Sequence, residues 1–145
     1  MSKKKISQKL LLEHSKAKVE LLGKYLDRYL NIIANDGFTE RIKIFDLFCG
    51  EGEYNNGGEG SPLTILRKVK NLHYVNKAKN KRIPPVDVLF NDIDKEKTIK
   101  LEKAIKSKHL YYPDFGKLEL RSYDYKELVT KLQAFLSSIK NQKAF

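Results

Sequence analysis

Apolar residues recur at helical spacing through the first quarter of the chain. From Leu10 to Ala34 most of them lie three or four positions apart, which predicts an amphipathic helix. Asn35-Asp36-Gly37 follows, and Asn and Gly tolerate the left-handed conformation that ends a helix. Residues 1–8 are polar and rich in lysine. We therefore expect a flexible basic N-terminus over 1–8 and a single folded domain over 9–145.

A strand is predicted over Arg41–Phe48. Its apolar residues do not alternate with polar ones, so they would cover both faces, as in the middle strand of a parallel sheet between helices. A glycine- and asparagine-rich loop then occupies Glu53–Gly60. Ser61 and Pro62 predict the start of the next helix, with Ser61 as N-cap and Pro62 at the first helical position. This helix should run to about Tyr74.

Strand-like and helix-like segments alternate through the rest of the chain. The expected order is a basic connector Val75–Pro85, a strand Val86–Phe90, a helix Lys95–Lys106, an aromatic turn His109–Phe115, a strand Lys117–Arg121 and a helix carrying Leu128, Leu132 and Phe135. Alternation of this kind predicts an α/β fold with parallel strands and right-handed crossovers. The expected architecture is a Rossmann-like sheet preceded by the amphipathic helix.

Length and composition limit the number of domains and the kinds of partner that the protein can have. The 145 residues suffice for one domain, and no stretch approaches the ~20 apolar residues that cross a bilayer. One cysteine excludes an internal disulfide and suits the cytoplasm. The net charge of +11 favours polyanionic partners, although many lysine-rich proteins bind none.

Three acidic residues fall at or just beyond the ends of the three predicted strands, namely Asp46, Asp92 and Asp124. Ligands of open α/β sheets bind outside these carboxyl ends. Asp46 is suited to accept N–H groups of the following turn, Asp92 to bind both hydroxyls of a ribose, and Asp124 to accept from an adenine amine. Each acid taken alone is also compatible with a loop carboxylate or a helix cap. Together they predict a nucleoside site.

The turn after the first strand contains Gly50 and Gly52, which allow backbone to approach a ligand. The dinucleotide pattern G-x-G-x-x-G is incomplete, because its third glycine is replaced by Asn55. Asp92 also follows Gly52 by 40 residues, and the helix begins only at Ser61. A ligand without phosphates, such as S-adenosylmethionine, therefore fits better than a nicotinamide dinucleotide.

The segment Asp46–Gly52 resembles the first motif of class I S-adenosylmethionine-dependent methyltransferases. With His14–Lys18, Tyr25-Leu26 and Gly60–Leu63, it is similar to the three-Cys-motif partner proteins (TcmP-like), which are bacterial methyltransferase-fold proteins. The resemblance spans about Leu12 to Asp94 and implies the cofactor fold, with strands in the order 3-2-1, but no substrate. The expected cofactor-binding residues are Asp46, Phe48, Gly50, Gly52, Asp92, Ile93 and Asp124.

The resemblance also implies further strands beyond these three. The fourth strand, which positions the methyl acceptor in such enzymes, would follow Lys140, so we expect only the N-terminal, cofactor-binding part of the fold. The strand Arg41–Phe48 would then lie at a sheet edge with unpaired backbone. We expect either a fragment of a longer protein or a homodimer that completes the sheet.

Three functions remain open. The first is the cofactor-binding portion of a methyltransferase with nucleic acid as acceptor. The second is a non-catalytic binding or partner protein of the same fold. The third, disfavoured by the incomplete glycine pattern, is a nicotinamide-dinucleotide enzyme. We assign no catalytic residue.

The cysteine and the histidines invite other assignments. Cys49 has no local base to activate it, so we interpret it as a small turn residue rather than a nucleophile. His14 is expected to brace the Ser61-Pro62 segment or to close the pocket. His73 and His109 have no partner at metal-ligand spacing, so we expect no metal site.

No acidic residue occurs between Ser61 and Val86, which makes this segment the best candidate for binding nucleic acid. The basic residues concerned are Arg67, Lys68, Lys70, Lys77, Lys79, Lys81 and Arg82. A solvated connector is an equally good interpretation. Tyr111, Tyr112 and Phe115 could stack on bases, or could instead belong to the core.

Overall fold

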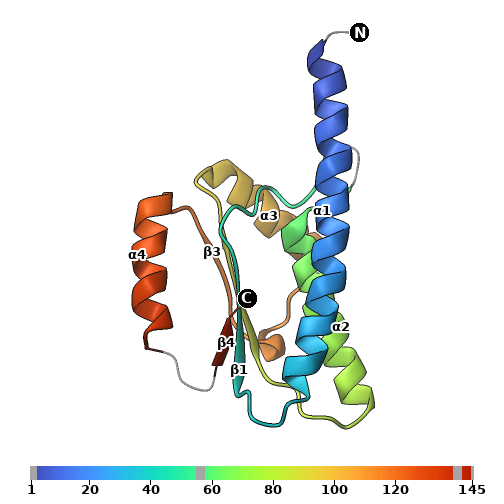
Figure 1. Cartoon of the computed structure of the whole chain (residues 1–145), viewed down its shortest axis with the longest axis vertical. Helices are drawn as coiled ribbons and strands as arrows, with labels where there is room; N and C mark the ends of the chain where they lie inside the picture. The colour runs from blue at the N-terminus through green and yellow to red at the C-terminus, as the bar shows by residue number, and fades with distance from the viewer. Residues whose placement is uncertain (1–2, 55–57, 139–141, 145) are drawn as a thin grey trace.

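The computed structural model describes residues 3–54, 58–138 and 142–144, and the side chains of 16–54 and 58–138. Figure 1 shows the order of the elements. They are α1 Lys3–Ala34, β1 Arg41–Asp46, α2 Ser61–Ala78, β2 Val86–Asn91, α3 Lys95–Ser107, the 3-10 turn η1 Pro113–Phe115, β3 Leu118–Arg121, α4 Tyr125–Leu136 and β4 Gln142–Ala144. None of the helices within the described residues combines the length and apolar character needed to cross a membrane.

The strands form one parallel sheet in the order β3-β2-β1-β4. This confirms the α/β class and the parallel sheet. The predicted sheet of three strands was incomplete, because β4 pairs with Arg41, Ile42 and Lys43 of β1. The first half of β1 therefore has a neighbour on each side. Residues 142–144 read Gln-Lys-Ala and show no apolar alternation, so the pattern of residues could not reveal this strand.

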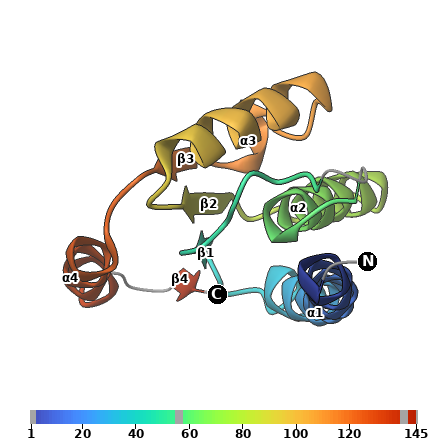
Figure 2. The ribbon, with the colours of Figure 1, turned by 90° about the horizontal axis from the view of Figure 1, so that it is seen from above.

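The two faces of the sheet are covered unequally. Helices α1 and α2 lie on one side and α4 on the other (Figures 1 and 2). Most buried apolar side chains form one cluster that joins α1, α2 and α3 to the sheet. Its largest members include Leu26, Leu30, Ile42, Ile44, Leu63, Phe90 and Leu101. On the other face α4 reaches β1 through an edge-to-face contact of Phe135 with Phe45, at 5.9 Å between ring centroids.

The two faces of β1 also differ in composition. Ile42 and Ile44 are buried in the core, whereas Arg41 and Lys43 alternate with them and bind Asp87 of β2. Asp87 is buried, and its Oδ1 also accepts from the Lys117 N–H at 2.8 Å. The prediction that β1 is apolar on both faces was therefore wrong for its first half. The neighbouring carboxylate is what allows two cations to lie against the sheet.

Two helices are longer than expected. Helix α1 begins at Lys3 rather than near Leu10, since no glycine or proline interrupts residues 3–9. Helix α2 continues past Tyr74 to Ala78 and ends before Asn80, whose φ of 52° lies in the left-handed region. Part of the predicted basic connector is thus helical.

Candidate functional site

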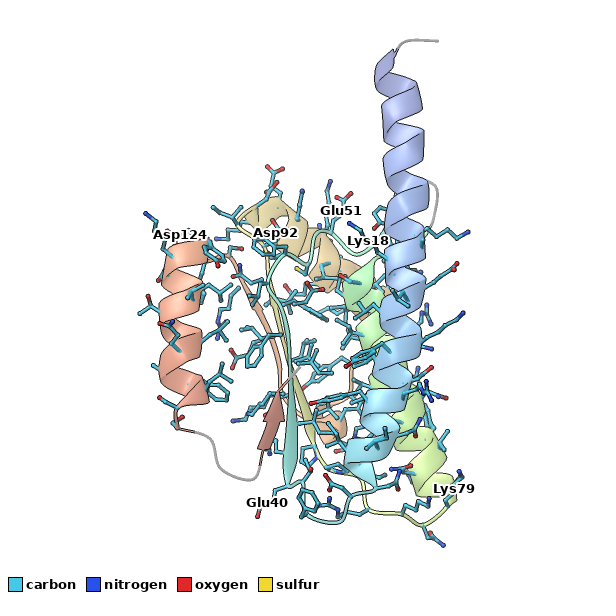
Figure 3. The ribbon with its side chains drawn as sticks, viewed as in Figure 1. Lys18, Glu40, Glu51, Lys79, Asp92 and Asp124 are labelled. Carbon is cyan, nitrogen blue, oxygen red and sulfur yellow. The ribbon has the colours of Figure 1, made fainter. Side chains whose placement is uncertain are left out.

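A cleft of about 460 Å³ opens beside the turn that follows β1. Its wall is formed by this turn, by α1, by the start of α2 and by α3. The lining includes Lys18, Leu22, Phe48, Gly50, Glu51, Gly52, Tyr54, Ser61 and Lys97. Figure 3 shows Lys18, Glu51 and Asp92 at the same end of the molecule. The cleft therefore lies at the carboxyl ends of the strands, where the sequence predicted a ligand site.

The two glycines of the turn both have positive φ, 71° at Gly50 and 90° at Gly52. A Cβ on Gly50 would have no heavy atom within 4 Å, so this position faces open space. A Cβ on Gly52 would lie 2.7 Å from Leu101 Cδ1, and this glycine packs against the core. Gly50 thus leaves room for a ligand, whereas Gly52 allows the turn to approach α3.

Asp92 holds the glycine turn in place. Its Oδ2 accepts from the Gly50 N–H at 3.0 Å, and its Oδ1 accepts from the Asp94 N–H at 2.9 Å. The Asp94 carboxylate in turn accepts from the Glu96 N–H at 3.0 Å and caps α3. Asp92 therefore accepts from the Gly50 N–H, a role that the sequence assigned to Asp46, whereas Asp46 accepts from the Phe48 N–H. Each carboxylate oxygen keeps a second lone pair for a ligand.

Asp46 is tied mainly to the start of α2. Ser61 Oγ donates to Asp46 Oδ2 at 2.6 Å, and Gly60 is the N-cap residue. The prediction that Ser61 caps α2 was therefore wrong, because its hydroxyl is used to join β1 to α2. Burial raises the pKa of Asp46, the nearby Asp92 adds to the rise, and hydrogen bonds from Ser61 and the Phe48 N–H oppose it.

Asn91 organises the edge of the sheet beneath the site. It is buried, and its Nδ2 donates to the Tyr123 carbonyl at 3.1 Å and the Leu47 carbonyl at 3.4 Å. Its Oδ1 accepts from the Tyr123 N–H at 2.9 Å. The side chain thus links the chain ends that follow three strands. The sequence analysis did not select this residue, although a polar side chain at the end of a mostly apolar strand was a usable signal.

The remaining predicted residues lie at the same edge, and of these only Phe48 belongs to the lining of the cleft. Phe48 is 72 % exposed and stacks on Tyr125, with 6.2 Å between ring centroids. Ile93 is 71 % exposed. Asp124 accepts from the Glu127 N–H at 2.9 Å as the N-cap of α4, so the cap interpretation holds for this acid. Of the seven predicted residues, Phe48, Gly50 and Gly52 line the cleft directly.

Comparison with protein-family models, curated proteins and solved structures finds no match to this chain. The site is therefore interpreted from its own geometry and chemistry.

The electrostatics of the turn bear on nucleophilic chemistry. Burial raises the pKa of the Cys49 thiol to about 12, and the charges of Asp46 and Asp92 contribute. The group is therefore a thiol rather than a thiolate at neutral pH, which argues against a nucleophile.

Two predictions from the sequence fall outside the described part of the structure. They concern the side chain of His14, expected to brace the Ser61-Pro62 segment or to close the pocket, and Asn55 of the glycine pattern.

Charged residues that the sequence reading did not select also line the cleft. Lys18 comes from α1 and Lys97 from α3, and both side chains are exposed. Glu51 and Glu53 add negative charge to the lining. Glu51 forms an ion pair with Lys100 at 3.4 Å, and Glu53 forms one with Lys108 at 2.8 Å. Residues so far apart in the sequence give no local motif, so only the fold brings them together.

The seven predicted basic residues separate into two groups. Arg67 binds Glu59 through two hydrogen bonds of 2.6 and 2.7 Å, and Lys68 binds Asp27 at 2.7 Å. Arg82 lies 3.8 Å from Asp36. The ion pairs found among the described residues do not include Lys70, which donates to the His109 carbonyl at 3.2 Å, or Lys77, Lys79 and Lys81. Three of these four lysines, Lys77, Lys79 and Lys81, lie at the end of α2 and just beyond it.

Proposed function

We propose that this chain is the cofactor-binding portion of an S-adenosylmethionine-dependent methyltransferase similar to the TcmP-like proteins, with nucleic acid as the acceptor. The observation that carries the proposal is the glycine turn, held by Asp92 and opening into a cleft of about 460 Å³. This volume falls within the range of ~300–1,000 Å³ usual for sites that take small molecules and cofactors.

The charges around the cleft favour S-adenosylmethionine over a dinucleotide. Lys18 and Lys97 supply positive charge, and Glu51 and Glu53 supply negative charge. In a zwitterionic ligand such as S-adenosylmethionine, the carboxylate can pair with the lysines, and the ammonium and sulfonium can pair with the glutamates. A pyrophosphate would face these acids and the first turn of α2, where Pro62 has no N–H to donate.

In this proposal Asp92 accepts from the ribose hydroxyls with its remaining lone pairs. Phe48 and Ile93 offer apolar surface for the adenine ring, and Asp124 supplies an acceptor for its amine. When bound, the cofactor would supply the methyl group. The single cysteine, held as a thiol, agrees with the cytoplasmic location proposed for this protein.

Calorimetry with S-adenosylmethionine, S-adenosylhomocysteine and NAD tests the proposal. We expect binding of the first two and loss of binding in Asp92→Ala. Glu40→Ala removes an exposed carboxylate at the opposite end of the molecule and serves as the control (Figure 3). Circular dichroism should show that both variants fold. Equal binding by Asp92→Ala and Glu40→Ala, or absence of binding to the folded wild type, would contradict the cofactor site.

The thinly covered side of the sheet favours a second candidate, a non-catalytic partner or binding protein. On that side α4 presents Leu136 to solvent while Phe135 contacts Phe45. A homodimer or another protein could cover this face. Light scattering of the intact chain tests the homodimer, and a monodisperse monomer that also transfers methyl groups would argue against this candidate.

A further inference from the structure

A second cleft lies between the C-terminal half of α2 and η1. Its volume is about 300 Å³, and its lining includes His73, Tyr74, Lys77, Tyr112, Asp114 and Phe115. Lys79, which follows α2, lies at the opposite end of the molecule from Asp92 (Figure 3). This cleft is therefore separate from the proposed cofactor site and shares no lining residue with it.

Aromatic rings form the walls of this cleft. Tyr74 is 55 % exposed and Tyr112 is 40 % exposed. Phe115 supports Tyr112 in an edge-to-face contact at 5.3 Å, and Lys70 Nζ lies 5.9 Å from the Tyr74 ring and 5.6 Å from the Tyr112 ring. Two large rings are thus held in place yet remain open to solvent. Exposed aromatic rings next to cations are the usual platform on which unpaired bases stack.

Tyr112 also lines a neighbouring cleft of about 380 Å³. Tyr111, Leu118 and Leu120 contribute to that lining, which is mostly apolar. A ring shared by two adjacent clefts offers positions for two successive bases. This arrangement suits a strand better than an isolated small molecule.

The charge around the cleft selects the class of ligand. Lys77, Lys79 and Lys81 are exposed at the end of α2, and the ion pairs of the described residues leave them unneutralised. Asp114 is the acidic group in the lining. Lysines without an ion pair beside exposed aromatic rings can bind the phosphates of a polyanion that run outside the cleft.

An exposed hydrogen-bond acceptor gives this cleft a chemical preference. Asp114 offers its exposed carboxylate. His73 is buried, and burial lowers its pKa against the opposing effects of the Val69 carbonyl and Asp114, so the ring is neutral at neutral pH. Its Nδ1 lies 3.0 Å from the Val69 carbonyl and must donate to it, and its Nε2 is buried with no partner among the described residues. Asp114 is therefore the accessible acceptor of the cleft.

We propose that the cleft between α2 and η1 binds an unpaired nucleobase with an exocyclic amine, presented by a single-stranded nucleic acid. The base contacts the rings of both Tyr74 and Tyr112, its amine donates to Asp114, and the adjacent phosphates contact Lys77 and its neighbours. This inference does not rest on the proposed cofactor. Because the two clefts lie at opposite ends of the molecule, this base would be an anchor and not a methyl acceptor.

Fluorescence anisotropy with labelled oligocytidylate and oligouridylate tests the proposal, with no cofactor added. Cytosine carries an exocyclic amine and uracil does not, so we expect tighter binding of oligocytidylate and a smaller difference in Asp114→Asn. Tyr74→Ala and Tyr112→Ala should each weaken binding by roughly 5- to 100-fold, the usual cost of losing one stacked base. Lys77→Gln should weaken both oligonucleotides equally and lower the salt slope by about 1.

Two matched substitutions serve as controls. Tyr25→Ala removes an exposed tyrosine from α1, and Lys126→Gln removes an exposed lysine from α4. Both should bind like the wild type. No binding by the folded wild type, or equal affinities for Tyr74→Ala, Tyr112→Ala and Tyr25→Ala, would overturn the proposal. Free cytidine monophosphate that binds as tightly as the oligonucleotide would assign the cleft to a nucleotide and overturn the role of a strand.

Discussion

Gly50 and Gly52 share a backbone requirement but differ in what surrounds them. The positive φ of each should make substitution by alanine cost about 1–2 kcal/mol. Gly52→Ala should cost about 1–3 kcal/mol more, because its Cβ would overlap Leu101. Gly50→Ala should instead abolish S-adenosylmethionine binding in a folded protein, since its Cβ enters the cleft. Urea unfolding measures the first difference and calorimetry the second. A larger loss of stability in Gly50→Ala would contradict this assignment.

The roles of single residues in the site were only partly predictable from the sequence. The residue types and their positions after the strands located Gly50, Gly52 and Asp92 correctly at one edge. Their partners were not predictable, because Asp92 binds a backbone N–H that lies 42 residues earlier in the chain. Ser61 looked like a helix cap by its local pattern, but tertiary contact with Asp46 decided its role.

At the scale of elements, Asp87 is the ionic contact between β1 and β2. Burial alone would raise its pKa, but hydrogen bonds from the Lys117 N–H, Lys43 and Arg41 outweigh this effect and hold the pKa below its ordinary value of 3.8. Asp87→Asn would leave Lys43 without its partner, so we expect a loss of about 3 kcal/mol at pH 7.

The pH dependence of this contribution follows from the lowered pKa. The stability due to Asp87 is fully present above the unfolded pKa of 3.8 and is lost as pH falls through the lower folded pKa. The gap between wild type and Asp87→Asn in urea unfolding should therefore be constant from pH 7 to 5 and narrow below about pH 4. A gap that widens in acid would contradict the role of Asp87.

The pairing of β4 with β1 gives a prediction about the sheet edge. Removing residues 139–145 should expose the backbone of Arg41, Ile42 and Lys43, and an exposed strand edge promotes pairing between chains. We expect more self-association by light scattering and a lower melting temperature. Removing Phe145 alone leaves the pairing of residues 142–144 intact and is the control. Equal behaviour of the two truncated chains would show that β4 does not protect this edge.

Over the whole molecule, the two proposed binding clefts lie at opposite ends of the sheet. Most of α2 and its packed core separate them, and they share no lining residue. We therefore expect saturating oligocytidylate to change the affinity for S-adenosylmethionine by less than about twofold, well below the 5- to 150-fold of typical allosteric coupling. Calorimetry with and without the oligonucleotide measures this. A large change would mean that one ligand reaches both ends.

The sequence by itself determined the α/β class, the parallel strands, the helix that precedes them and the end of the sheet where a ligand would bind. These features follow from local periodicity and from the rule that parallel strands place their carboxyl ends together. Only the tertiary structure decided the partners of Asp46, Asp92 and Asn91, the pairing of β4 with β1, and the gathering of Tyr74, Tyr112 and Lys77 around one cleft. Those outcomes depend on contacts between residues distant in the chain, and no local pattern encodes them.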